Sequence, residues 1–327
     1  MPRRPAFTRM SIGALRAKVR PAAGQTYRGR RNMKLGVFTV GIPDLTPEEG
    51  AQALKEAGYD GVEWRVTHVP EKFRDEEPSF WRNNLCTFEP RVEEAERARR
   101  ISQEAGLEIV GLGTYLSVGD LEATEDAMSF ARTAGAPQLR VGVAKPGEHT
   151  AYAEQFELTR NYLTRVEALC QVYSVRALVE IHHGTICPSA SLAHRLVSGL
   201  DPRSIGVIFD PGNMVHEGFE DYRIGLELLG PHLAHVHVKN AAYERPEGGG
   251  VWKPRWSPLE DGVVDFERLV VALEGVGYDG WLVMEDFSAV RPSRETLQHN
   301  LRLIQDLLSK VYTPNRRNGA ESRGRGS

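Results

Sequence analysis

Hydrophobic positions along the chain follow two alternating patterns from Lys34 onward. Short runs rich in β-branched, leucine and aromatic residues predict β-strands, and longer runs with apolar residues every three or four positions predict amphipathic helices. The predicted strands are 34–41, 61–66, 108–116, 138–143, 176–183, 205–210, 234–240 and 280–287. The predicted helices are 46–58, 91–105, 121–134, 151–173, 189–199, 221–229, 265–276 and 293–311. Each predicted strand is therefore followed by one helix.

This alternation predicts a parallel sheet, because each helix carries the chain back to the edge where the next strand begins. Eight strand–helix pairs favour a closed (β/α)₈ TIM barrel as a single catalytic domain over residues 33–312. A doubly wound open sheet is the alternative, but no glycine-rich phosphate turn follows the first strand. The long connections 67–90 and 241–262 both follow strands, so we expect them at the catalytic end of the barrel.

The charge distribution separates a basic N-terminal segment from an acidic body. The chain has 41 Lys and Arg against 44 Asp and Glu, and residues 1–33 hold nine of the basic residues and no acid. Without those nine, 32 basic residues face 44 acidic ones, which gives residues 34–327 a net charge of −12. An acidic body argues against a nucleic-acid partner, whose phosphates call for a basic surface.

The two ends of the chain are expected to lie outside the folded domain. Residues 1–32 lack the apolar core of a secretory signal, which predicts a disordered basic extension, with a transit peptide or a nucleic-acid arm as alternatives. Met33 opens the first periodic segment and is a candidate start of the protein itself. Residues 313–327 are rich in Arg, Gly and Ser, a composition typical of a disordered tail.

Cysteine usage and hydropathy bear on the compartment. Cys86, Cys170 and Cys187 are too few, in a chain of 327 residues, to form a disulfide framework, and they favour a reducing environment. No run approaches the roughly 18 apolar residues of a membrane span. We therefore expect a cytoplasmic protein that does not cross a membrane.

Chemistry-bearing side chains stand at the ends of four consecutive predicted strands. Strands five to eight end in Glu180, in Asp210, in the pair His235 and His237, and in Glu285, and the carboxyl ends of barrel strands surround one shared mouth. Ionised carboxylates in a barrel interior cost several kcal/mol unless they are paired or bind a metal. Their arrangement therefore predicts one divalent metal ion. Mn²⁺ is the preferred ion for these oxygen and nitrogen donors, with Mg²⁺, Co²⁺ and Zn²⁺ as alternatives.

These motifs resemble those of the xylose isomerase-like barrel superfamily, the sugar phosphate isomerase and epimerase group that includes D-tagatose 3-epimerase, inosose dehydratase and inosose isomerase. The resemblance covers residues 34 to about 310 and rests on VEIHHG (179–184), FDPGN (209–213), HVHVKN (235–240) and GWLVMED (280–286). It implies that Glu180, Asp210, His237 and Glu285 bind the metal. It also implies that Glu180 and Glu285 act as base and acid on the two faces of the substrate.

Three positions depart from the sugar epimerases of that group. This chain has Asn213 where they have a His, Ile186 where they have a Glu, and Tyr243 where they have an Arg. Because those groups contact substrate hydroxyls in the epimerases, a simple ketohexose epimerase is not favoured. Asn213 and Lys239 are more similar to the dehydratase and generic isomerase branches, and we predict that both contact the substrate.

Other side chains near the predicted strand ends are candidates for the same site. His182 shares a strand face with Glu180, which makes it a candidate auxiliary acid or base, and a hydrogen bond to a ligand carboxylate is its alternative role. The remaining substrate-binding candidates, for each of which plain packing is the alternative, are Glu63, Trp64, Tyr115, Trp252 and Trp256.

The predicted function is that of a metal-dependent isomerase, epimerase or dehydratase. Its substrate would be a sugar, keto-sugar or inositol derivative that loses a proton next to a carbonyl through an enediolate. No Arg or Lys cluster is evident near the motifs, which favours a substrate without phosphate. The oligomeric state stays open, although relatives in this group often form dimers or tetramers.

Three alternatives remain. A lyase of the same superfamily that cleaves a 3-keto-glycoside by β-elimination would use the same site. An apurinic endonuclease would need three metals and further ligands on strands two to four, where Glu63 is the one candidate. A binding protein without catalysis is the third alternative, and the complete four-ligand set argues against it.

Overall fold

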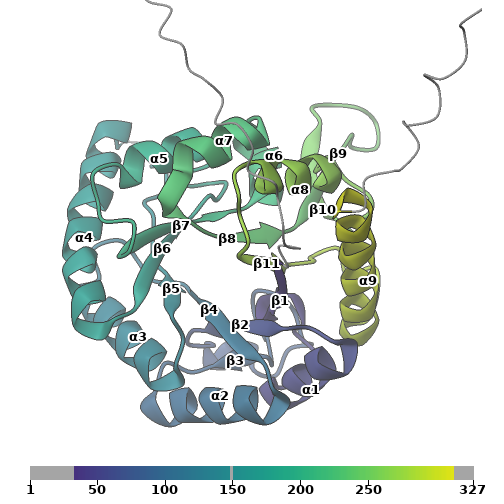
Figure 1. The fold of residues 1–327 in the computed structure, drawn as a ribbon, viewed down its shortest axis with the longest axis horizontal. Coiled ribbons are helices and arrows are strands. Elements are labelled where there is room, and N and C mark those ends of the chain that lie inside the picture. Colours follow the sequence, from purple (N-terminus) through teal and green to yellow (C-terminus); the bar gives the residue numbers. More distant parts are fainter. Residues whose placement is uncertain (1–32, 148–149, 313–327) are drawn as a thin grey trace, which may run out of the picture. The chain divides into compact units, whose positions relative to one another are not determined.

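The computed structural model describes residues 33–147 and 150–312, so the predicted extension 1–32 and tail 313–327 lie outside the described residues. Eight parallel strands close into a barrel within this part of the chain, because β1 pairs with both β2 and β11 (Figure 1). The barrel strands are β1 (Lys34–Phe38), β2 (Gly61–Val66), β4 (Glu108–Thr114), β5 (Gln138–Arg140), β6 (Arg176–Glu180), β7 (Ile205–Phe209), β8 (Leu233–Val238) and β11 (Trp281–Met284). The predicted (β/α)₈ barrel is confirmed.

Helices follow the strands and surround the barrel (Figure 1). Those that match the predicted helices are α1 (Pro47–Ala57), α2 (Val92–Ala105), α3 (Leu121–Ala134), α4 (Tyr152–Tyr173), α5 (Ala190–Val197), α7 (Tyr222–Leu229), α8 (Phe266–Gly275) and α9 (Ser293–Tyr312). The elements that the sequence pattern did not predict are α6 (Pro211–Glu217), β3 (Thr87–Phe88), β9 (Asn240–Glu244), β10 (Lys253–Ser257) and the 3₁₀ turns Thr39–Gly41, Glu71–Phe73 and Gly230–His232. Several predicted strands also end earlier than expected, since β5 stops at Arg140 and the residues after it line a cavity.

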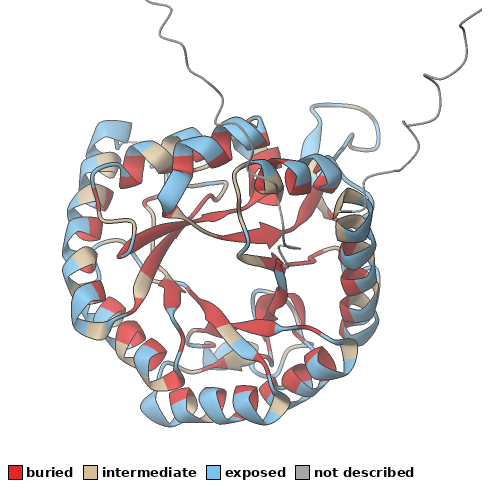
Figure 2. Cartoon of the chain, viewed as in Figure 1, coloured by how far each residue is buried: buried red, intermediate tan, exposed pale blue. Residues whose placement is uncertain are grey.

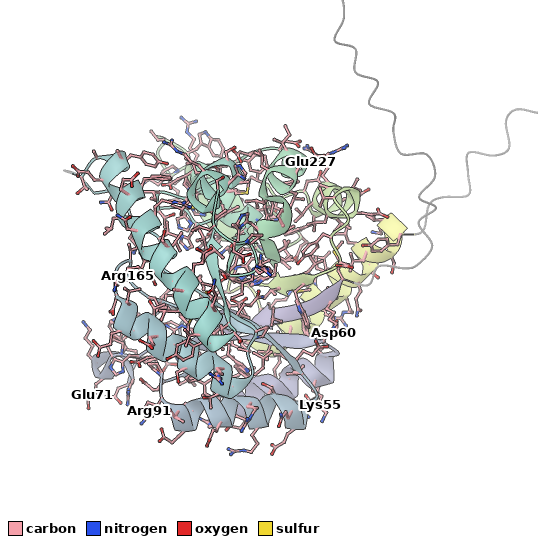
Figure 3. The ribbon with its side chains drawn as sticks, turned by 60° about the vertical axis from the view of Figure 1, so that its left-hand side comes forward. Lys55, Asp60, Glu71, Arg91, Arg165 and Glu227 are labelled. Carbon is pink, nitrogen blue, oxygen red and sulfur yellow. The ribbon has the colours of Figure 1, made fainter. Side chains whose placement is uncertain are left out.

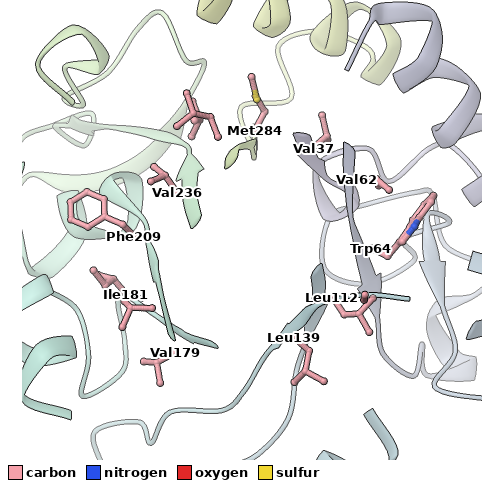
Figure 4. Close-up of a cluster of buried hydrophobic side chains, with 14 of the residues drawn as sticks. Val37, Val62, Trp64, Leu112, Leu139, Val179, Ile181, Phe209, Val236 and Met284 are labelled. Atoms are coloured by element: carbon pink, nitrogen blue, oxygen red, sulfur yellow. The ribbon is translucent and has the colours of Figure 1, made fainter. Parts of the chain in front are cut away.

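The main hydrophobic core lies between the barrel and its helices. Every barrel strand contributes an outward-facing apolar side chain to it, among them Val37, Trp64, Leu139, Phe209 and Met284 (Figure 4). Buried positions accordingly concentrate on the strands and on the inner faces of the helices, while the outer faces are exposed (Figure 2). This layer holds the eight strands in place independently of what fills the barrel.

The interior of the barrel is unusually polar. Period-two alternation turns Glu63, Gln138, His235 and His237 inward, and all four are buried. A smaller apolar cluster that includes Phe38, Val110, Val283 and Phe287 shares the interior with them. The inward-facing residues therefore make a poor hydrophobic core and suggest a site.

The helices begin at defined N-terminal caps, and charged side chains cover their exposed faces. Thr46 and Glu49 form a reciprocal capping box at the start of α1, with Pro47 in the first helical position. Figure 3 shows charged side chains such as Lys55, Arg165 and Glu227 projecting from the helices. None of the described helices is both long and apolar enough to traverse a bilayer.

Candidate metal centre

The Asp-Pro-Gly-Asn motif at the end of β7 explains how one carboxylate is aimed into the barrel. Asp210 is the N-cap of α6, and its Oδ1 accepts a 2.8 Å hydrogen bond from the backbone N–H of Asn213. Pro211 occupies the first helical position, where no backbone donor is needed. With Oδ1 engaged in the cap, Oδ2 is left to face the barrel interior.

The four predicted ligands converge on one point. Their donor atoms, from Glu180, Asp210, His237 and Glu285, all lie within 4.8 Å of one another, and all four residues are buried. Nδ1 of His237 lies 3.3 Å from Glu180 Oε1, 3.4 Å from Asp210 Oδ2 and 3.5 Å from Glu285 Oε2. This nitrogen is buried without an aligned hydrogen bond to any of them. A buried acceptor facing three carboxylate oxygens is the geometry that a divalent cation would complete.

A fourth carboxylate, that of Glu63, orients the histidine ligand from behind. Glu63 Oε2 lies 3.1 Å from His237 Nε2 and 3.2 Å from His235 Nε2. Gln138 Nε2 lies 3.1 Å from His235 Nδ1 and also donates to the carbonyl oxygen of Val110. The bond to Glu63 leaves Nδ1 of His237 free for a metal, as carboxylates behind metal-binding histidines commonly do. Glu63, His235 and His237 are a second group whose donor atoms could hold an ion, and Nε2 of His235 is buried without an aligned hydrogen bond.

Two cations, the buried Lys239 and the partly buried Arg140, neutralise the acids. The ammonium of Lys239 lies 2.7 Å from Asp210 Oδ2 and 2.5 Å from Glu285 Oε2. The guanidinium of Arg140 lies 2.5 Å from Glu180 Oε2, on the oxygen that faces away from His237. Burial would raise the pKa of Glu180, but Arg140 and His237 outweigh it and hold that pKa well below its ordinary value. Burial does raise the pKa of Glu285, although Lys239 opposes the shift.

The charges of the residues in and around the cluster balance when one divalent cation is added. Glu63, Glu180, Asp210 and Glu285 carry four negative charges, and Lys239 and Arg140 carry two positive ones. Burial lowers the pKa of His235, which is therefore neutral. The remaining deficit of two charges equals that of one divalent cation bound to a neutral His237. The charges of the residues thus fit such an ion as well as their donor atoms do.

A cavity of about 740 Å³ opens above this cluster. Glu180, Glu285, Lys239, Arg140 and His182 line its polar part. Apolar and aromatic side chains from the segments that follow the strands form the rest of its walls, including Trp81, Tyr115, Val143, Trp256 and Phe287. Trp81 and Trp256 belong to the long connections 67–90 and 241–262, which we predicted to lie at the catalytic end of the barrel. A cavity of this size accommodates a ligand larger than a single sugar ring.

A stack of imidazole rings that ends on an indole supports one wall of the cavity, to which His182, His183 and Trp256 contribute directly. His182 stacks on His183 with ring centroids 4.5 Å apart, and His183 stacks on His216 at 4.2 Å. His216 then contacts Trp256 at 4.5 Å. Burial, with His183 nearby, lowers the pKa of His216 to about 4, and burial also lowers the pKa of His182. His182 and His216 are therefore neutral near pH 7.

The other predicted site residues, which are the auxiliary acid or base His182 and the substrate-binding candidates, divide into those that line the cavity and those that do not. Lys239, Tyr115 and His182 line the cavity, as does Trp256. Asn213 lies behind the ligands, where its Nδ2 donates to Asp210 Oδ2 at 2.8 Å and to Glu180 Oε1 at 3.3 Å.

The other three candidates stand apart from the cavity wall. Glu63 lies beneath His237. Trp64 packs between barrel and helices, donating to Ser102 Oγ, because adjacent residues of a strand face opposite sides. Trp252 is 59% exposed in the connection between β9 and β10.

Sequence reasoning missed Arg140, Gln138 and His183. Arg140 and Gln138 occupy alternate positions of β5, separated by the buried Leu139. Polar residues at every second position of a barrel strand mark its inward face, and that signal would have found both. His183 had no such signal, because its position follows the end of β6 in an irregular segment.

Comparison with known proteins places these residues in a family context. Residues 51–307 match the family model described as a xylose isomerase-like TIM barrel. An inosose dehydratase of Clostridium perfringens is 25% identical over 281 residues, which cover 78% of this chain and 90% of that protein. An inosose dehydratase of Geobacillus thermodenitrificans is 29% identical over 146 residues, which cover 40% of this chain and 47% of that protein. This second match therefore spans about half of the relative's length.

Solved structures share the fold. The IolI protein with a bound zinc atom superposes with a TM-score of 0.66 at 16% identity, covering 86% of this chain and all of that one. The 3-keto-D-glucoside 4-epimerase YcjR of E. coli superposes with a TM-score of 0.64 at 16% identity, covering 84% of this chain and all of that one. At such identities the likeness concerns the fold alone.

Proposed function

This chain belongs to the xylose isomerase-like TIM barrel family, and we propose that it is a divalent-metal-dependent isomerase, epimerase or dehydratase. Its proposed substrate is a sugar, keto-sugar or inositol derivative, in keeping with the inosose dehydratases among its relatives. The observation that carries the proposal is the convergence of three carboxylate oxygens and one imidazole nitrogen below a cavity.

The metal would be held by the four atoms that face one another, which are Glu180 Oε1, Asp210 Oδ2, His237 Nδ1 and Glu285 Oε2. A divalent cation held there supplies the Lewis acidity that polarises a substrate carbonyl and stabilises the charge of an enediolate. Three oxygens and one nitrogen suit Mn²⁺ first, with Mg²⁺, Co²⁺ and Zn²⁺ as alternatives.

Two carboxylates of the cluster would move the proton. Glu285 Oε2 faces His237 and Lys239, and Glu285 lines the cavity, so its Oε1 would be the acceptor of a proton from carbon. A raised pKa suits a group that takes up a proton and returns it. Glu180 is held ionised by Arg140 and is the partner on the other side of the substrate. We assign the two residues the roles of base and acid in the exchange of a proton next to a carbonyl.

His182 and Lys239 would serve the substrate's oxygens. Both line the cavity beside the two catalytic carboxylates. Since burial lowers the pKa of His182, its imidazole is neutral and can give or accept a proton at a hydroxyl group. Lys239 contributes a positive charge that stabilises an oxyanion. The guanidinium carbon of Arg140 lies 4.8 Å from the centroid of the Tyr115 ring. As part of the cavity wall, Tyr115 would contact the substrate.

The size and walls of the cavity favour one alternative. A space of about 740 Å³ bordered by Trp81, Trp256 and Phe287 has room for a second, less polar group beyond the reacting sugar. A 3-keto-glycoside is such a substrate, and removal of its C2 proton would be followed by departure of the group at C1. The same residues would perform that β-elimination.

Proton exchange at carbon is the direct test. The Mn²⁺-loaded protein is incubated in D₂O with a ketose, an inosose or a 3-keto-glucoside, and the exchange is measured by NMR. We expect deuterium to appear at the carbon next to the carbonyl. The product separates epimerase from dehydratase or lyase. The EDTA-stripped protein serves as the control and should show no exchange. Absence of exchange with every substrate, despite stoichiometric bound metal, would refute proton abstraction from these classes.

A further inference from the structure

The ammonium of Lys239 contacts carboxylate oxygens that are candidate metal ligands. Its side chain is 3% exposed, and its ammonium contacts Asp210 Oδ2 at 2.7 Å and Glu285 Oε2 at 2.5 Å. The same two oxygens are those that face His237 Nδ1. The ammonium therefore engages two of the four candidate donor atoms.

Arg140 behaves differently, which shows that the position of Lys239 is not a general property of the buried cations. Its guanidinium contacts Glu180 through Oε2, while Oε1 is the oxygen facing His237. Arg140 also donates twice to the carbonyl oxygen of Thr114, which fixes it outside the ligand cluster. Arg140 can keep its ion pair when the donor atoms are occupied, whereas Lys239 shares those donor atoms directly.

Where it lies, the ammonium of Lys239 is also within cation–π distance of two aromatic rings on the cavity side. The rings of Trp256 and Phe287 have their centroids 5.1 Å and 5.3 Å from Nζ of Lys239, and both side chains line the cavity. Aromatic faces attract an ammonium within about 6 Å, and lysine has a flexible stem on which to turn. Gly212 gives that stem space, because a Cβ there would lie 2.8 Å from Cγ of Lys239.

We propose that Lys239 is an internal counter-ion that competes with the metal: its ammonium holds the Asp210–Glu285 pair in the metal-free protein and turns toward the cavity when a divalent cation binds. Two buried carboxylates are costly unless cations compensate them, and in the metal-free protein Lys239 contacts both. The released ammonium then faces the substrate over Trp256 and Phe287. The inference rests on the metal site of the proposed function and makes Lys239 a positioning residue as well as a substrate contact.

Metal titration of the full chain tests the competition. Lys239→Met keeps the apolar stem and removes the charge, and Lys145→Met is the matched control, since Lys145 lines the same cavity but is exposed. We expect EDTA-stripped Lys239→Met to bind Mn²⁺ at least about tenfold more tightly than the wild-type protein in isothermal titration calorimetry, because no ion pair must be given up. Lys145→Met should bind as the wild type does. Equal or weaker binding by Lys239→Met would overturn the proposal.

A measurement on the wild-type protein covers the case in which Lys239→Met does not fold without metal. Acetylation by acetic anhydride, located by mass spectrometry, reports the accessibility of each lysine. Lys239 should be modified several-fold faster in the Mn²⁺-loaded protein than in the stripped one, while Lys145 changes little. An unchanged or slower reaction of Lys239 would overturn the proposal. If neither the wild type nor Lys239→Met bound Mn²⁺, the metal site and this proposal would both be refuted. If the protein catalysed C–H exchange but Mn²⁺ did not change the acetylation rate of Lys239, this inference alone would be refuted.

Discussion

Replacing Glu63 by glutamine tests whether the carboxylate behind the metal centre sets the affinity of the ligand in front of it. Glu63 is 1% exposed, so Glu63→Gln preserves the shape of a buried side chain while it removes one negative charge. The carboxylate lies 3.1 Å from His237 Nε2 and 3.2 Å from His235 Nε2. Because the amide oxygen can still accept a hydrogen bond from His237, the substitution isolates the effect of the charge.

The expected loss follows from two opposing electrostatic effects. A unit charge roughly 7 Å from a divalent ion contributes about 5 kcal/mol at an effective dielectric constant of about 20. The same carboxylate also stabilises the proton that His237 holds in the metal-free protein, which offsets much of that energy. Removing a group behind a metal ligand typically weakens metal affinity about 10- to 100-fold, or by about 1.4 to 2.8 kcal/mol. We expect the loss for Glu63→Gln to fall in this range.

Calorimetric titration of the stripped protein with Mn²⁺ measures that loss, with circular dichroism to confirm the fold. Glu108→Gln is the control, since it removes an equal charge from an exposed glutamate paired with Lys34 on the surface. Its Mn²⁺ affinity should equal that of the wild type. A folded Glu63→Gln protein that binds Mn²⁺ as tightly as the wild type would refute the role of Glu63 in tuning His237.

Three further predictions concern the catalytic acids, the pH dependence and the N-terminal segment. Glu180→Gln and Glu285→Gln should each abolish C–H exchange in D₂O with an unchanged circular dichroism spectrum, and unfolding would instead identify these acids as structural. Burial would lower the pKa of His237, but Glu63 and Glu285 outweigh it and hold that pKa well above its ordinary value. The proton therefore competes with the metal, and calorimetric Mn²⁺ affinity should fall as pH decreases from about 8 to 5, whereas a pH-independent affinity would contradict this. Deleting residues 1–32 should leave the exchange rate unchanged, because every proposed site residue lies in the barrel, and a large loss of rate would assign those residues a functional role.

The sequence predicted the barrel well because the governing signals are local and repeat eight times. Each of the eight helix predictions matches an observed helix within a residue or two, and each strand prediction contains the observed strand or overlaps it closely. The four ligand positions could be found for the same reason, since each ends or directly follows a strand. The alternation of side chains along a strand then fixes which residues face inward.

The supporting interactions depended on contacts between distant segments, which a single sequence does not reveal. Nothing in the sequence around Glu63 indicates that it will meet His237, 174 positions away, across the barrel. The antiparallel pairing of β9 with β10 likewise turns Trp256, and not Trp252, toward the cavity. The alternation rule applies inside strands and gave no guidance within these long connections.

The polar barrel interior constrains how this protein can evolve or be engineered. Gln138, His235 and Glu63 are one another's partners, and replacing them together by apolar side chains of similar volume would remove buried charge and amide groups from the centre of the fold, a change that often adds stability. A selection for thermal resistance alone would therefore favour replacing them, and it would dismantle the support of His237 as it did so. Stabilising substitutions are better sought in the outer apolar layer between strands and helices, where packing can improve without reaching the site.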